Sequence, residues 1–135
     1  MAHVSKKKLS EQTERALKNK LVDMLRIIGQ DRHVKFSLNE LLTFTEGIML
    51  AKRLSIIYLV NKEMPTWDIA RILNVSTSTV IRIEKIYDRG GYKNIETVFK
   101  RLEPTLLDVI KMIHAAMPSK VGKGRWKNFF EDFEN

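Results

Sequence analysis

The stretch STSTVIRIEK, residues 76–85, has the side chains that are best suited, by type and spacing, to bind another molecule. Four consecutive hydroxyl residues precede a helical pattern that contains Arg82 and Lys85. Hydroxyls and cations of this kind bind phosphate oxygens and base edges, which favours contact with a nucleic acid. A run of hydroxyls ahead of a helix is also typical of a simple cap, because Ser76 can accept from the free first-turn amides. The surrounding elements must decide between these interpretations.

The residues around this stretch predict a helix-turn-helix, with one helix over 66–73 and a second over 76–88. The motif needs apolar side chains where its two helices cross, and these are Ile69, Leu73, Val75, Val80 and Ile83. Ala70 is the small residue of a close crossing. Asn74 tolerates the left-handed backbone that the turn requires. The predicted motif therefore has the right residue type at each structural position.

In a helix-turn-helix, the N-terminal end of the second helix enters the major groove of DNA. Short hydroxyl side chains let the backbone approach the duplex there, and the partly positive helix end attracts phosphate. The methyls of Thr77 and Thr79 and the side chain of Ile81 suit thymine methyls, whereas Arg82 and Lys85 suit phosphates or guanine. The predicted DNA contacts are Ser76, Thr77, Ser78, Thr79, Ile81, Arg82 and Lys85.

The composition agrees with a polyanionic partner. The 135 residues suit one domain with a core, and the net charge of +8 favours double-stranded DNA over an anionic membrane. A basic protein that is merely soluble is the alternative. Without cysteine there is no thiolate metal site, the three histidines lack ligand spacing, and no enzyme motif is visible. We expect a cytoplasmic protein that is not an enzyme and has no membrane partner.

The rest of the chain predicts an all-α fold, because apolar residues recur at spacings of three and four almost throughout. A flexible basic arm over 1–9 precedes a helix over 10–28, which Gly29 is expected to end. The apolar stripe of this helix is a candidate dimer face, although an ordinary core face would look the same; it consists of Leu17, Leu21, Leu25 and Ile28.

Two capping signals predict the helices that follow. Ser37 and Glu40 form a capping box for a short helix to about position 43. Thr45 and Glu46 open a longer helix to about position 60.

Beyond the glycines at 90–91, Pro104 divides the helical pattern into predicted helices over 94–102 and 104–117. A basic and aromatic tail closes the chain. We therefore divide the chain into the arm, a helical domain over 10–103 with its helix-turn-helix at 66–88, and a C-terminal extension over 104–135.

Two segments, EMPTWDIARILNVSTSTVIRIEKIYD and TFTEGIMLAKRLSIIYLV, resemble the reading region and the preceding helix of the Trp repressor superfamily. The likeness is closest to the Trp-repressor-related regulators that have no tryptophan role, and it covers about residues 15–100. It implies an all-helical, intertwined homodimer that binds operator DNA and represses transcription. One helix-turn-helix, the reading head of each subunit, touches only a few base pairs. Symmetric half-sites would supply the rest of the specificity.

The same resemblance implies an effector pocket, with Thr43, Arg53, Thr79 and Arg82 at the places of the tryptophan-binding residues. However, Ile83 replaces a glycine and Ile86 replaces a serine. A pocket cannot absorb several extra carbons without strain. We therefore expect no tryptophan corepressor and no cofactor, and leave open whether another small molecule binds.

Trp67 stands on the first helix of the predicted motif. An indole there can stack on sugar–phosphate or close an effector pocket. Packing against neighbouring helices is the commoner role of a tryptophan, and we expect it here.

Three functions fit the sequence. The first is a dimeric, sequence-specific transcription regulator. The second is the DNA-recognition subunit of a transposase, which would need a catalytic partner chain. The third is a nucleoid-type or RNA-associated structural protein, whose binding would depend steeply on salt without preferring any sequence.

Overall fold

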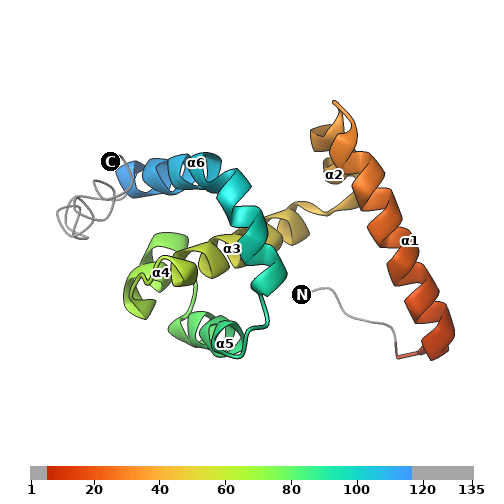
Figure 1. Cartoon of the computed structure of the whole chain (residues 1–135), viewed down its shortest axis with the longest axis horizontal. Coiled ribbons are helices and arrows are strands. Elements are labelled where there is room, and N and C mark those ends of the chain that lie inside the picture. The colour runs from red at the N-terminus through yellow and green to blue at the C-terminus, as the bar shows by residue number, and fades with distance from the viewer. Residues whose placement is uncertain (1–5, 117–135) are drawn as a thin grey trace. The chain divides into compact units, whose positions relative to one another are not determined.

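The computed structural model describes residues 6–116, and all regular structure in that range is helical (Figure 1). The helices are α1 (Glu11–Gln30), α2 (Val34–Leu41), α3 (Phe44–Asn61), α4 (Thr66–Leu73), α5 (Thr77–Asp88) and α6 (Lys93–Ala116). The expected all-α fold is confirmed. The first five residues of the predicted arm and the basic, aromatic tail over 117–135 lie outside the described residues.

The chain forms two compact units that divide within α3, at Ala51 and Lys52. In the first unit, α2 folds back against α1 (Figure 1). Ser10 caps α1 by accepting from the Thr13 N–H at 3.3 Å. The helix then continues through Gly29 to Gln30, two residues past its expected end. Neither α1 nor α2 contains a buried residue, so this unit leaves its apolar stripes exposed.

The start of α2 differs from the predicted one. Ser37, expected to cap this helix with Glu40, lies inside it. The helix is instead preceded by His33 as its cap residue, four residues before Ser37, because Asp31 Oδ1 accepts from the His33 N–H at 2.6 Å and turns the chain.

The start of α3 is a capping box, but its members are Thr43 and Glu46. Thr43 Oγ1 accepts from the Glu46 N–H at 3.2 Å, and Glu46 Oε2 accepts from the Thr43 N–H at 2.9 Å. Two first-turn amides are thereby satisfied. The prediction that Thr45 opens this helix is therefore wrong by two positions, and Glu46 keeps its predicted place in the cap.

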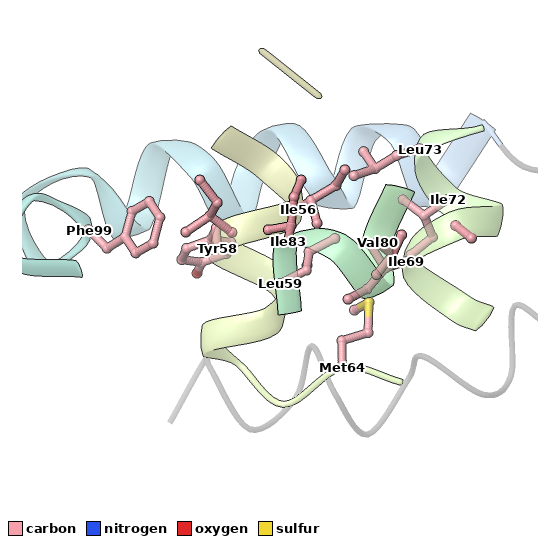
Figure 2. Packing of buried hydrophobic residues seen from close by; sticks show 12 residues of the cluster. Ile56, Tyr58, Leu59, Met64, Ile69, Ile72, Leu73, Val80, Ile83 and Phe99 are labelled. Atoms are coloured by element: carbon pink, nitrogen blue, oxygen red, sulfur yellow. The ribbon is translucent and has the colours of Figure 1, made fainter. Parts of the chain in front are cut away.

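The core of the second unit lies where the end of α3 meets α4, α5 and α6 (Figure 2). Tyr58 of α3 and Phe99 of α6 meet edge to face, with ring centroids 5.3 Å apart, a geometry that ring quadrupoles favour. The buried core residues are Ile56, Ile57, Tyr58, Leu59, Met64, Ile69, Ala70, Ile72, Leu73, Val80, Ile83 and Phe99. This core holds α4 and α5 in a fixed relation.

The last helix, α6, is a single helix of 24 residues, so the predicted break at Pro104 is wrong. Proline lacks the N–H that would bond four residues back, but a helix can bend at that point instead of ending. Figure 1 shows α6 changing direction along its length.

Candidate nucleic-acid interface

The turn between α4 and α5 has the predicted left-handed residue. Asn74 has φ 51° and ψ 56°. Its N–H donates to the Arg71 carbonyl at 3.4 Å, and the Val75 N–H donates to the Ala70 carbonyl at 3.0 Å. These bonds satisfy carbonyls that the end of α4 would otherwise leave free. From α3, Lys52 Nζ donates to the Asn74 carbonyl at 3.4 Å, a contact that the sequence did not predict.

The two helices cross on the side chains that the motif predicted. Ile69 and Val80 are fully buried, and Ala70, Leu73 and Ile83 are nearly so (Figure 2). Val75 is half-buried against the same core. The helix-turn-helix expected from the sequence is therefore present.

Two side-chain hydrogen bonds outside the apolar core also position α5. Thr66 Oγ1 donates to Glu84 Oε1 at 2.7 Å and ties the start of α4 to the middle of α5. Asn61 Nδ2 donates to the Tyr87 hydroxyl at 2.9 Å and ties the end of α3 to the last turn of α5. Sequence patterns missed both bonds, because the partners stand far apart in the chain.

Burial raises the pKa of Tyr87 above its ordinary value of 10.0, and the bond from Asn61 acts in the opposite direction. The carboxylates of Glu96 and Asp88 raise the pKa further. The phenol therefore stays protonated at neutral pH and holds the end of α5 as a neutral group.

The hydroxyl run at the start of α5 divides into two roles. Ser76 caps the helix, because its Oγ accepts from the Thr79 N–H at 3.2 Å. The same Oγ lies 2.8 Å from Thr79 Oγ1 and 3.0 Å from Ser78 Oγ. The hydroxyls of Ser76 and Thr79 thus build the helix end, and Thr77 is half-buried beside them.

The outer face of α5 consists of Ser78, Ile81, Arg82 and Lys85, all of them exposed. These positions lie opposite Val80 and Ile83, as the helical repeat requires. The face combines a hydroxyl, a branched apolar side chain and two cations. Such a set can hydrogen-bond to base edges, meet a thymine methyl and neutralise phosphates.

The residues of the implied effector pocket have other visible roles. Thr43 caps α3 in the first compact unit, whereas the other three belong to the second. Arg53 and Arg82 are exposed, and Thr79 takes part in the cap of α5. Ile83, at the place of the family's glycine, is only 6% exposed and belongs to the core.

Trp67 contradicts its expected packing role, because its side chain is 73% exposed. α4 buries Ile69, Ala70, Ile72 and Leu73. Residues 67 and 71 therefore stand on the opposite face of the helix. The helical repeat itself predicts this outward position. The expectation of packing relied instead on the general preference of tryptophan for burial.

Two other classes of site are absent from the described residues. Within 6–116, no group of three or more histidine, cysteine or acidic side chains is placed to hold a metal ion. None of the helices in the same range is long and apolar enough to cross a membrane.

Comparison with known proteins gives one assignment. No curated protein and no solved structure matches the chain. The family model described as Trp repressor protein matches residues 16–103, which is more than half of the chain and includes the whole helix-turn-helix. The chain therefore belongs to the Trp repressor family of helix-turn-helix DNA-binding regulators.

Proposed function

We propose that this protein is a homodimeric, sequence-specific transcriptional repressor that inserts α5 into the major groove of a palindromic operator. The outer face of α5 carries the proposal, because its exposed side chains match the chemistry of a groove while its inner face is locked in the core. Arg82 and Lys85 bind guanine or phosphate, Ser78 bonds to a base edge or phosphate, and Ile81 with Thr77 meets thymine methyls. Ser76 and Thr79 shape the helix end that approaches the DNA.

The dimer is supported by the apolar side chains that the first compact unit leaves exposed. They include Leu17, Leu21, Val22, Met24, Leu25, Ile27, Phe36, Leu41, Phe44 and Ile48, with Phe44 85% exposed. Exposed apolar surface of this extent marks a partner interface, and a second copy is the partner that a palindromic operator requires. Two reading heads then bind half-sites about 34 Å apart, one turn of the duplex.

We also propose that tryptophan is not the corepressor. The support is Ile83, whose branched side chain takes part in core packing at the place where the resemblance has a glycine. A ligand there would have to displace core atoms, which is costly in a close-packed interior. Added tryptophan should therefore leave operator affinity unchanged.

Selection of bound duplexes from a random pool tests the proposed function, and we expect a palindromic consensus. On that duplex, Arg82→Ala should lose at least about tenfold in affinity, the effect of removing a bidentate base contact. The matched control is Arg101→Ala, which removes another exposed cation, on α6, and should bind nearly as wild type. Unchanged binding by folded Arg82→Ala would overturn the reading role of α5. Binding without a consensus would favour a nucleoid-type structural protein.

A further inference from the structure

Trp67 is a large side chain that the fold leaves without a visible task. It occupies the first turn of α4 and is 73% exposed, while the buried face of this helix faces the other way. Among the described residues, no hydrogen bond involves its indole N–H. An exposed aromatic ring on the first helix of a helix-turn-helix is available for contact with a ligand of that motif.

The first turn of α4 is tied to the middle of α5. Thr66, the neighbour of Trp67, is bonded through its hydroxyl to Glu84 at 2.7 Å. Glu84 directly precedes Lys85 and follows Ile81 by three residues, so it stands at the edge of the face proposed to enter the groove. Thr66, next to Trp67 in the chain, therefore adjoins that edge.

The part of the chain around Trp67 has no apolar patch of the kind that a protein partner would need. Throughout 51–80, all of it described, no other large hydrophobic side chain is exposed. The exposed neighbours are Glu63, Pro65 and, one helical turn on, Arg71. A protein partner would need a wider apolar patch, such as the one that the first compact unit offers. A sugar–phosphate backbone needs only a flat ring, a donor and a nearby cation.

We propose that Trp67 contacts the sugar–phosphate backbone of the bound duplex. The indole N–H donates to a phosphate oxygen and the ring covers the adjacent deoxyribose, because the first helix of this motif crosses the backbone. The inference rests on the proposed function, since it requires α5 to lie in the groove. The contact adds affinity that does not depend on base identity, and it fixes how the reading head sits on the DNA.

Fluorescence tests the contact directly, because the chain has two tryptophans and the second, Trp126, can be replaced. In a Trp126→Phe background, acrylamide should quench Trp67 strongly in the unbound protein and far less once the selected duplex is added. Binding itself is followed independently through the anisotropy of a labelled duplex. Trp67 that is already shielded before DNA is added would overturn the proposal, because a protein surface would then cover it.

Substitution gives the second readout. Trp67→Ala should weaken operator binding about tenfold, the worth of a hydrogen bond to a charged group, and Trp67→Phe should fall between it and wild type. The slope of affinity against salt should not change, because no charge is removed. Val98→Ala, which trims an exposed apolar residue of α6, is the matched control and should bind as wild type. Melting temperatures should match throughout.

The outcomes separate this inference from the function on which it rests. Wild-type binding with unchanged Trp67 quenching, or a Trp67→Ala variant of wild-type affinity, overturns the contact and leaves the regulator standing. If neither wild type nor any variant binds duplex DNA, the proposed function falls and the contact falls with it.

Discussion

Residues 1–51 and the unit that begins at Lys52 both form helices with apolar stripes, but they use those stripes differently. The second unit packs them into a core, whereas α1 and α2 bury nothing. Helical periodicity is the same local signal in both units. Burial depends on which helices the chain brings together, and the first unit brings together too few of them. The comparison teaches that the second unit buries its apolar side chains within one chain, whereas the N-terminal helices leave theirs exposed.

The largest expected effect comes from one truncation in each unit. Ile69→Ala removes a fully buried side chain from the core and should cost about 3 kcal/mol of unfolding free energy at any protein concentration. Leu17→Ala, at a side chain that is 56% exposed, should destabilise the protein only by weakening the proposed dimer. Its effect should therefore change with protein concentration. Urea unfolding at two concentrations measures both effects, with sedimentation velocity to follow association.

The same two variants can also contradict the contrast between the two units. If Leu17→Ala unfolds the reading head by as much as Ile69→Ala, and equally at every concentration, the first unit stabilises the second within one chain. Sedimentation of the wild type as a monomer would leave the exposed stripes of α1 without their proposed partner.

The helix-turn-helix was predictable because its signals are local and mutually consistent. Ala70, Asn74 and the apolar positions of 69–83 fix the crossing within fifteen residues, and the structure follows them closely. The starts of α2 and α3 were not predicted correctly. The S/T-x-x-E pattern occurs at both Ser37 and Thr43, but α2 already begins at the turn made by Asp31. The same local pattern therefore has different outcomes in different contexts.

Other features were beyond the reach of sequence patterns. The bond from Thr66 to Glu84 and the bond from Lys52 to the turn join residues far apart in the chain, and polar pairs of this kind leave no periodic trace. Trp67 was misplaced because burial was inferred from residue type instead of from its place in the helical repeat.

A smaller effect is expected at the helix ends of the second unit. α3, α4 and α5 are each followed by a residue with positive φ, namely Glu63 (59°), Asn74 (51°) and Gly90 (77°). In each case the next N–H donates to a carbonyl five residues back, at 2.9–3.0 Å. The left-handed backbone costs about 1 kcal/mol for a residue with a Cβ, and less for asparagine than for glutamate. Three identical turns therefore carry three different degrees of strain.

Glu63→Gly should stabilise the second unit by about 0.5 to 1 kcal/mol, because glycine relieves the strain at some cost in chain entropy. Asn74→Ala should destabilise it by about 1 kcal/mol, since alanine lacks asparagine's tolerance of this conformation. Urea midpoints measure both changes. Opposite signs at two equivalent turns would show that backbone strain sets the effect. Shifts of the same sign would instead indicate that side-chain contacts dominate, and the turns would not be equivalent.

The smallest effect concerns the capping box of α3, a feature of residues 1–51 that should form without a partner chain. The bond from the Thr43 N–H, followed by the bond with the Thr43 side chain, lowers the pKa of Glu46 below its ordinary value of 4.5. A lowered folded-state pKa means that the charged carboxylate stabilises the fold above the ordinary pKa. This stabilisation is lost as the pH falls through the lowered value. The cap should therefore weaken only in acid.

An NMR titration of the Glu46 carboxyl carbon measures this pKa directly. Thr43→Ala should bring it partway back toward the ordinary value, because the side-chain bond is lost while the backbone N–H remains. Glu46→Gln supplies the control, since glutamine can take the same place in the box without titrating. The titration should be the same in wild type and in Leu17→Ala, because the cap depends on local bonds and not on the dimer. A pKa that shifts when the dimer is weakened would show that even this first turn of α3 is shaped by the partner chain, and the contrast between the two units would then extend to their local structure.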